Sequence, residues 1–158
     1  MSDFEFTLNS FEETEAFAKC VAAVVVAPCS IALQGDLGAG KTTFARGFLH
    51  AFGHEGNVKS PTYTILEPYQ LGDITVNHLD LYRLVDPEEL EFIGAHELFT
   101  DNTINLIEWP EQGAGWLPEM DLWLKIVHIE DGRRLCLSAN TPRGMSLLAK
   151  MEFNSKKS

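Results

Sequence analysis

A glycine-rich stretch at residues 35–42 holds the residue types in this sequence that are best suited to chemistry. Its spacing, Gly-x-x-x-x-Gly-Lys-Thr, is that of a phosphate-binding P-loop. Glycines let a backbone turn sharply and approach an anion, which the loop N–H groups and the dipole of a following helix would face. We expect Lys41 to place its charge between the β- and γ-phosphates of a nucleotide and Thr42 to offer its hydroxyl to Mg²⁺. The residues predicted to contact the nucleotide here are Gly35, Asp36, Leu37, Gly38, Ala39, Gly40, Lys41, Thr42 and Thr43.

Two carboxylates are candidates for the metal site. A P-loop enzyme holds Mg²⁺ with a carboxylate at the end of a hydrophobic strand. Glu108 follows the mostly apolar residues 104–107, whereas Asp80 follows residues 76–79, where two polar side chains interrupt the run. We predict that Glu108 shares the metal with Thr42 and that Asp80 acts through a metal-bound water or the attacking water. Either carboxylate can instead be an ordinary strand-end group that caps a helix.

Thr62 and Thr64 lie in a polar loop after the P-loop helix, where switch I lies in related nucleotide triphosphatases. A hydroxyl there can sense the γ-phosphate through Mg²⁺. We predict that the loop at residues 53–64 orders around Mg²⁺ and the γ-phosphate. The alternative is a simple β-turn whose geometry is set by Pro61.

No adenine-binding motif is readable, and two side chains outside the P-loop are candidates. Phe11 begins a helix that precedes the P-loop strand, and Arg133 lies in a turn at residues 131–133. A guanidinium can lie flat over an aromatic ring such as a purine. Each residue also has an ordinary interpretation, Phe11 in the core and Arg133 at a solvated hairpin end.

Composition narrows the class of protein. The chain has 158 residues and a net charge of −11, which argues against direct, strong nucleic-acid binding. No apolar run approaches the ~20 residues of a membrane-spanning helix, and the N-terminus lacks a signal-peptide pattern, so we expect a cytoplasmic location. The three cysteines form no Cys-x-x-Cys pair and are expected to be small buried side chains in a reducing compartment.

Strand and helix patterns alternate along the chain. Strands are expected at residues 4–8, 30–33, 63–69, 74–81, 103–109, 122–129 and 135–139, and helices after Ser10, after the P-loop, after Asp86 and after Thr141. The pattern predicts one α/β domain over residues 1–158. We expect a P-loop NTPase fold with a mixed sheet, in which parallel strands lie near the P-loop and hairpins form the edges.

Four stretches together resemble the signature set of the TsaE family, formerly YjeE. They are residues 35–43 (Gly-Asp-Leu-Gly-Ala-Gly-Lys-Thr-Thr), 60–64 (Ser-Pro-Thr-Tyr-Thr), 78–84 (His-Leu-Asp-Leu-Tyr-Arg-Leu) and 106–110 (Leu-Ile-Glu-Trp-Pro). The P-loop alone is shared by many nucleotide triphosphatases, but the combination is specific. The ends of the chain, before residue 31 and after residue 116, carry no part of the resemblance.

The resemblance implies a bacterial ATPase needed to make threonylcarbamoyladenosine in tRNA. It implies ATP or ADP and Mg²⁺ as ligands, and TsaB and TsaD as protein partners that contact the tRNA in its place. At the matching positions, the resemblance implies that Lys41 binds phosphate and that Thr42 binds Mg²⁺. It also implies that Glu108 is the other metal ligand and that Asp80 is an active-site carboxylate. The resemblance also makes Thr62 and Thr64 part of a switch loop and places Trp109 on the active face.

Other nucleotide-binding classes remain as alternatives. A small-molecule kinase usually carries an arginine-rich lid, and this chain has only scattered arginines outside any recognisable arginine-finger context. These are Arg46, Arg83, Arg133, Arg134 and Arg143. A GTPase is disfavoured because no Asn-Lys-x-Asp run is present. A non-catalytic switch, in which bound nucleotide only alters affinity for a partner, also agrees with the sequence.

Overall fold

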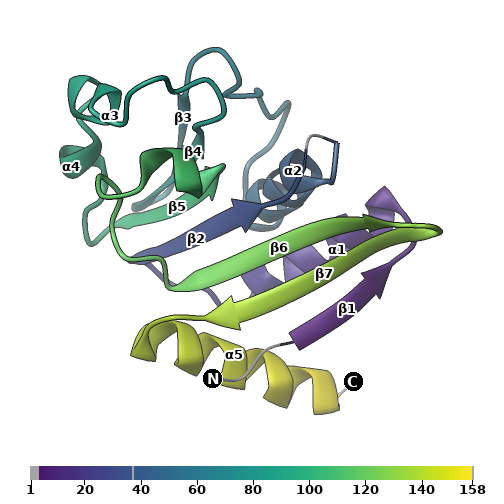
Figure 1. The fold of residues 1–158 in the computed structure, drawn as a ribbon. Helices are drawn as coiled ribbons and strands as arrows, with labels where there is room; N and C mark the ends of the chain where they lie inside the picture. The colour runs from purple at the N-terminus through teal and green to yellow at the C-terminus, as the bar shows by residue number, and fades with distance from the viewer. Residues whose placement is uncertain (1–3, 37, 158) are drawn as a thin grey trace.

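A seven-stranded mixed sheet forms the centre of the molecule (Figure 1). The computed structural model describes residues 4–36 and 38–157. The strands are β1 (Phe4–Leu8), β2 (Cys29–Gln34), β3 (Leu66–Leu71), β4 (Ile74–Asp80), β5 (Thr103–Glu108), β6 (Leu122–Ile129) and β7 (Gly132–Ala139). Their order is β1-β7-β6-β2-β5-β4-β3. The four strands β6, β2, β5 and β4 run parallel, while β7, β1 and β3 pair antiparallel at the edges. The predicted α/β fold with a mixed sheet and edge hairpins is confirmed.

Three long helices pack on one face of this sheet. They are α1 (Phe11–Ala22), α2 (Lys41–Ala51) and α5 (Pro142–Lys157). Three short helices, α3 (Glu89–Phe92), α4 (Ala95–Leu98) and the 3-10 helix η1 (Pro110–Gly113), belong to the part of the chain around β4 and β5. Within the described ranges, no helix has the length and apolar character needed to cross a membrane.

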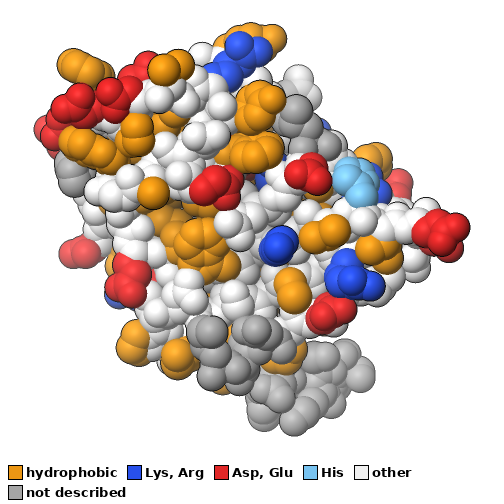
Figure 2. Space-filling model, in the orientation of Figure 1, with side chains coloured by type: hydrophobic (Ala, Val, Ile, Leu, Met, Phe, Trp, Pro, Cys, Tyr) orange, Lys and Arg blue, Asp and Glu red, His pale blue; other side chains and the backbone are white. Residues whose placement is uncertain are grey.

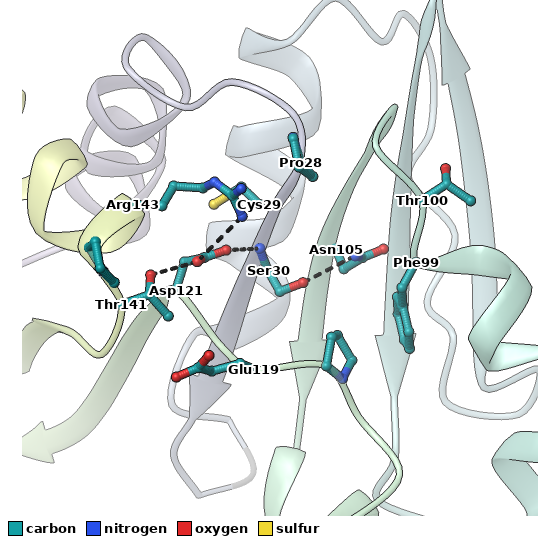
Figure 3. Close-up of a pocket in the computed structure, with 12 residues that line it drawn as sticks. Pro28, Cys29, Ser30, Phe99, Thr100, Asn105, Glu119, Asp121, Thr141 and Arg143 are labelled. Carbon is teal, nitrogen blue, oxygen red and sulfur yellow. Dashed lines mark hydrogen bonds and ion pairs between the residues drawn. The ribbon is translucent and has the colours of Figure 1, made fainter.

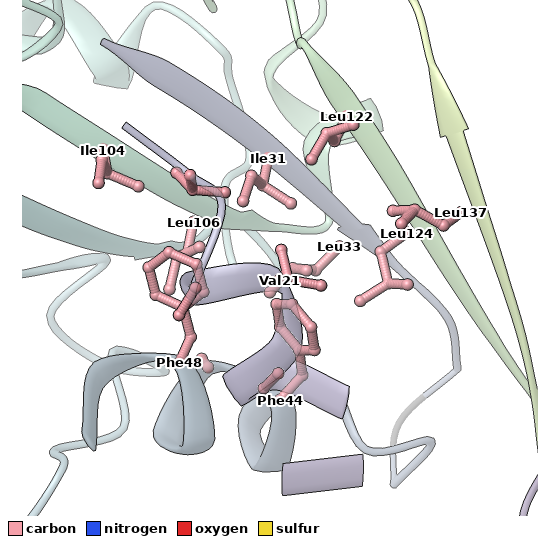
Figure 4. Packing of buried hydrophobic residues seen from close by; sticks show 14 of the residues in the cluster. Val21, Ile31, Leu33, Phe44, Phe48, Ile104, Leu106, Leu122, Leu124 and Leu137 are labelled. Atoms are coloured by element: carbon pink, nitrogen blue, oxygen red, sulfur yellow. The ribbon is translucent and has the colours of Figure 1, made fainter. Parts of the chain in front are cut away.

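Helix α2 is fixed on the sheet by its apolar face. Phe44 and Phe48 are four residues apart, so they share one face of the helix, and both are fully buried. Figure 4 shows them in one cluster with Ile31 of β2 and Leu106 of β5. Burying a phenylalanine side chain stabilises a fold by about 1.5–3 kcal/mol. This packing therefore holds the amino end of α2 beside the carboxyl end of β2, where the P-loop lies.

The hairpin of β3 and β4 differs from the prediction at its start. We expected the first arm to begin at Tyr63, but β3 begins at Leu66. The residues before it form a turn, closed by a hydrogen bond of 2.7 Å from the Ile65 N–H to the Pro61 carbonyl. Ile65 has φ of 69°, a left-handed conformation that is rare for a β-branched residue. The turn keeps Thr62 out of the sheet and directs it toward the end of β4.

The expectation for the cysteines holds only in part. Cys29 is buried, whereas Cys20 is exposed and Cys136 is half-buried, and all three are free thiols. Burial, reinforced by the nearby Asp121 carboxylate, raises the pKa of Cys29 to about 12. Cys29 therefore stays protonated at neutral pH and packs as a small apolar side chain.

Candidate active site

The P-loop connects the end of β2 to the first residue of α2, as the sequence predicts. Gly40 precedes α2 with φ of +116°, a conformation that L side chains rarely adopt. Gly35 passes so close to β6 that an added Cβ would lie 2.5 Å from the Ile126 carbonyl oxygen. Both positions thus require glycine. Leu37, which we predicted to contact the nucleotide, lies outside the described residues.

A pocket of about 230 Å³ opens over this loop. Its lining comes from five segments that are far apart in the sequence. They contribute Phe11, Gly38, Gly40, Lys41, Thr42, Thr43, Thr62, Asp80, Glu108 and Trp109. The structure therefore gathers the four residues predicted to be catalytic around the amino end of α2. The remaining described loop residues, Gly35, Asp36 and Ala39, belong to the same turn but do not line this pocket.

The two candidate carboxylates lie side by side. Asp80 ends β4, Glu108 ends β5, and the two residues are direct partners in the parallel register. Glu108 is 2% exposed, and both of its carboxylate oxygens lie 3.4 Å from the hydroxyl of Thr42. Asp80 accepts hydrogen bonds from the Tyr82 N–H at 3.0 Å and from the Thr62 hydroxyl at 3.4 Å. Glu108 thus faces Thr42, the predicted metal ligand, and Asp80 faces Thr62 of the predicted switch loop.

Burial shifts the pKa values of two charged groups in this site. Burial raises the pKa of Asp80, and the neighbouring Glu108 charge adds to the rise, while the hydrogen bond from the Tyr82 N–H opposes it. Burial also lowers the pKa of Lys41, against the attraction of Glu108 and Asp80. The pocket is therefore a partly desolvated place where a cation and two carboxylates face one another, an arrangement typical of functional sites.

Lys41 is held in place by two contacts. Its ammonium group donates a hydrogen bond of 2.5 Å to the Gly35 carbonyl and lies 3.8 Å from the centre of the Trp109 ring. Trp109 has φ of 56°, a strained conformation for a bulky side chain. The Tyr82 ring packs against the same indole at 5.0 Å between centroids. Trp109, which the resemblance places on the active face, lines the pocket and supports Lys41.

Arg133 and Phe11 lie together beside the loop. The Arg133 guanidinium is 5.8 Å from the Phe11 ring, and both residues line a second cavity of about 260 Å³. Phe11 also lines the P-loop pocket, so the two cavities adjoin. Phe11 is 56% exposed and is not a core residue. Arg133 is not a solvated hairpin end either, because it donates hydrogen bonds to the carbonyls of Ala39 at 2.9 Å and Gly38 at 3.3 Å.

Sequence reasoning missed one residue of the site, His78. The sequence analysis counts it only as one of the two polar side chains that interrupt the apolar run at residues 76–79. Its side chain is fully buried, and its Nε2 lies 2.7 Å from a carboxylate oxygen of Glu108. Because side chains alternate along a strand, the position two residues before Asp80 must share its face. The two-residue spacing between His78 and Asp80 was therefore the sequence feature that could have placed His78 in the site.

A larger cavity, of about 490 Å³, lies at the opposite end of the strands (Figure 3). Its buried carboxylate, Asp121, accepts hydrogen bonds from the Ser30 N–H at 2.9 Å and from the Thr141 hydroxyl at 2.6 Å. Arg143 lies 3.8 Å from the same group. These contacts join the starts of β2, β6 and α5. The cavity is remote from the P-loop, and the polar groups around Asp121 serve the fold.

We expect Asp121→Ala to destabilise the protein by about 1–3 kcal/mol, because it leaves the buried Ser30 N–H without its acceptor. Glu119→Ala is the matched control, since Glu119 lines the same cavity but is exposed. Its effect should stay within about 0.5 kcal/mol. Urea denaturation followed by circular dichroism measures both. Equal stability of the two variants would show that the Asp121 contacts contribute nothing.

Comparison with known proteins identifies the family of this chain. The family model described as "Threonylcarbamoyl adenosine biosynthesis protein TsaE" matches residues 8–136, a span that includes every residue lining the P-loop pocket. The chain belongs to the TsaE family. The resemblance seen in the sequence is thereby confirmed, and the protein has its role in the biosynthesis of threonylcarbamoyladenosine in tRNA. TsaE is an ATPase family, and membership implies nucleotide binding.

Individual relatives agree with this assignment. A "tRNA threonylcarbamoyladenosine biosynthesis protein TsaE" from Haemophilus influenzae is 51% identical over 117 residues, which cover 74% of this chain and 74% of the relative. A TsaE of the same description from Rickettsia bellii is 38% identical over 141 residues, covering 89% of this chain and 97% of the relative. The solved "Crystal structure of Bacillus subtilus YdiB" superimposes with a TM-score of 0.81 at 29% identity, covering 98% of this chain and 97% of that one.

Proposed function

We propose that this TsaE protein binds ATP with Mg²⁺ and hydrolyses it in support of tRNA threonylcarbamoyladenosine formation, together with TsaB and TsaD. In this proposal residues 1–158 form one ATPase domain with a P-loop NTPase fold. The observation that carries the proposal is the pocket at the amino end of α2, which brings Lys41, Thr42, Asp80 and Glu108 together. We place the protein in the cytoplasm, where its three free cysteines suit a reducing compartment.

The loop would bind the phosphates. The N–H groups at the start of α2 and the helix dipole attract anions, and Lys41 adds a full positive charge beside them. Because Lys41 is already held by the Gly35 carbonyl and the Trp109 ring, its charge is in place before the nucleotide arrives. A charge that need not reorganise stabilises a developing anion more effectively than one that must.

The donor set of the pocket fits Mg²⁺. Thr42 and Glu108 present hydroxyl and carboxylate oxygens toward one another, and Mg²⁺ takes oxygen ligands. It usually takes only one or two of these ligands from the protein. We assign Thr42 and Glu108 as its ligands. Bound there, Mg²⁺ would neutralise charge on the β- and γ-phosphates.

Asp80 and Thr62 would act on the γ-phosphate side. The Thr62 hydroxyl lies 3.4 Å from Asp80, so the switch loop and the second carboxylate already meet. The raised pKa of Asp80 suits a group that orients a water and accepts its proton. We propose that Asp80 positions the attacking water and that Thr62 senses the γ-phosphate. Thr64 takes no part in this, since its hydroxyl donates to Glu67 outside the pocket.

We expect Phe11→Ala and Arg133→Ala each to weaken ADP binding. The adjoining cavity that both residues line would receive the adenine, with the base against Phe11 and the guanidinium. Loss of one stacking contact should reduce the affinity about 2- to 30-fold, corresponding to ~0.5–2 kcal/mol. Arg133→Ala should have the larger effect, because it also releases the Gly38 and Ala39 carbonyls.

Isothermal titration calorimetry with ADP measures these affinities. Arg134→Ala is the matched control, because Arg134 is the next residue on β7 but pairs with Glu5 away from both cavities. Wild-type affinity in both the Phe11 and the Arg133 variants would rule out this adenine site.

The charge of the protein supports indirect contact with tRNA. The net charge is −11, and on the face shown in Figure 2 the Lys and Arg side chains are interspersed with Asp and Glu. A nucleic-acid groove normally presents clustered positive charge. We therefore propose that TsaB and TsaD, rather than this chain, hold the tRNA substrate.

Phosphate release, measured with and without TsaB–TsaD, tests the proposed function. Release that requires Mg²⁺ and rises with the partners supports the ATPase. Transfer of the γ-phosphate to a small acceptor instead would establish the kinase alternative. Nucleotide binding with neither release nor transfer would leave the non-catalytic switch. The ATPase proposal fails on either of the last two results.

A further inference from the structure

Within the part of the chain that the structure describes, Glu108 is the only hydrogen-bond partner of the His78 side chain. The ring is fully buried in β4, and its Nε2 lies 2.7 Å from a Glu108 carboxylate oxygen. A carboxylate accepts hydrogen bonds, so Nε2 carries the hydrogen and donates it. The other ring nitrogen, Nδ1, has no hydrogen-bond partner among the described residues.

This arrangement is unfavourable for a residue that serves the fold alone. A buried polar atom without a partner lowers stability, and an apolar side chain at the same position would avoid that loss. Both neighbours of His78 along the same face, Val76 and Asp80, are buried as well, so the ring has no access to solvent through them. The contact with Glu108 is therefore the feature that distinguishes histidine from leucine at this position.

The contact also fixes how the Glu108 carboxylate is turned. The terminal torsion of a glutamate is soft and takes a broad range of angles. Here one oxygen is held by His78 at 2.7 Å, while the Thr42 hydroxyl lies 3.4 Å from both oxygens. With His78 holding one oxygen, rotation of the carboxylate is restricted, and both oxygens stay 3.4 Å from the Thr42 hydroxyl.

We propose that His78 is a positioning residue that orients Glu108 for Mg²⁺. This inference rests on the proposed function, in which Thr42 and Glu108 hold the metal. Residues that hold a metal ligand in place commonly contribute 10- to 100-fold to metal affinity. His78 touches neither nucleotide nor metal in this proposal and acts only through Glu108.

The experiment compares three substitutions at this position. His78→Gln places an amide N–H where histidine Nε2 lies, whereas the shorter His78→Asn reaches only as far as Nδ1. His78→Leu removes the donor. For each variant, calorimetry measures ADP affinity in EDTA and again across a Mg²⁺ titration, which needs no turnover. Thermal melting reports on folding.

We expect all folded variants to bind ADP in EDTA within about 3-fold of the wild type, because the P-loop is unchanged. The Mg²⁺ concentration that produces half of the change in ADP affinity should rise about 10- to 100-fold in His78→Leu and His78→Asn. His78→Gln should stay within about 5-fold of the wild type, since it restores the donated hydrogen bond.

Two results would overturn the inference. One is unchanged Mg²⁺ dependence in His78→Asn and His78→Leu. The other is an equal loss in all three variants, already present in EDTA, which would indicate a structural role. If His78→Leu does not fold, the Gln and Asn variants, which are both polar, decide the matter. If the wild type binds ADP with the same affinity with and without Mg²⁺, the metal site of the proposed function is refuted instead.

Discussion

Lys41→Ala should reduce phosphate release by at least about 10²- to 10³-fold, the loss typical when one preorganised group that stabilises transition-state charge is removed. The loop N–H groups remain in the variant, so nucleotide still has a binding site. What is lost is a charge that the protein holds in a partly desolvated pocket, 4% exposed and fixed between the Gly35 carbonyl and the Trp109 ring. Such a charge acts on the transferring phosphoryl group more strongly than one in water.

Phosphate release by purified protein, combined with thermal melting, measures this effect. Lys125→Ala is the matched control, because Lys125 is an exposed lysine on β6 that does not line the pocket. We expect both variants to fold and only Lys41→Ala to lose hydrolysis. Near-normal phosphate release by folded Lys41→Ala would refute the role of Lys41.

TsaB and TsaD should accelerate hydrolysis strongly, because Lys41 is the only cationic side chain among the described residues that lines the pocket. No arginine of the described residues lines the pocket. Arg46 contacts Glu15, and Arg83 lies over the ring of Tyr63. An arginine supplied by a partner increases the rate by ~10³–10⁵-fold in GTPases. We expect slow hydrolysis by the protein alone and a rise toward this range if TsaB–TsaD supplies an arginine.

The same interaction should depend on the nucleotide through Thr62. A pull-down of TsaB–TsaD with ATP, ADP or no nucleotide should show different capture in the three states. Thr62→Ala should weaken this difference more than it weakens ADP binding, since ADP has no γ-phosphate to sense. Thr64→Ala is the control from the same loop, as Thr64 bonds Glu67 outside the pocket. Equal capture of the wild type in all three states would exclude the switch.

Local sequence patterns were sufficient to predict most of the architecture. The P-loop spacing and the capping residues lie within a few positions of the elements they control, and Ser10 does cap α1 by accepting from the Glu13 N–H at 3.2 Å. Strand β3 was misplaced because β-branched and aromatic residues at 63–65 favour a strand. The turn there depends on a hydrogen bond and on the positive φ of Ile65, which composition does not reveal.

The contacts of the site that could not be predicted from the sequence join residues that are far apart in the chain. Arg133 reaches carbonyls 94 and 95 positions away in the P-loop. His78 meets Glu108 across 30 positions, and only the register of β4 and β5 brings them together. From the sequence, a histidine in an apolar strand only interrupts the hydrophobic pattern, and its role becomes clear once its contact with Glu108 is known. The roles of Lys41, Thr42, Asp80 and Glu108 remain predictions that the experiments above test.

The direct pairing of Asp80 with Glu108 restricts how the length of this chain can vary. Inserting or deleting one residue within β4 or β5 would turn one carboxylate to the opposite face of the sheet, away from Thr42. A change of two residues would keep the face but move the carboxylate by about 6.6 Å along its strand. The turn at Gly72, at the far end of β4, has no such restriction, because extra residues there leave the pairing of β4 with β5 unchanged. Insertions and deletions that preserve activity should therefore be confined to turns of that kind, and β4 and β5 should keep their lengths.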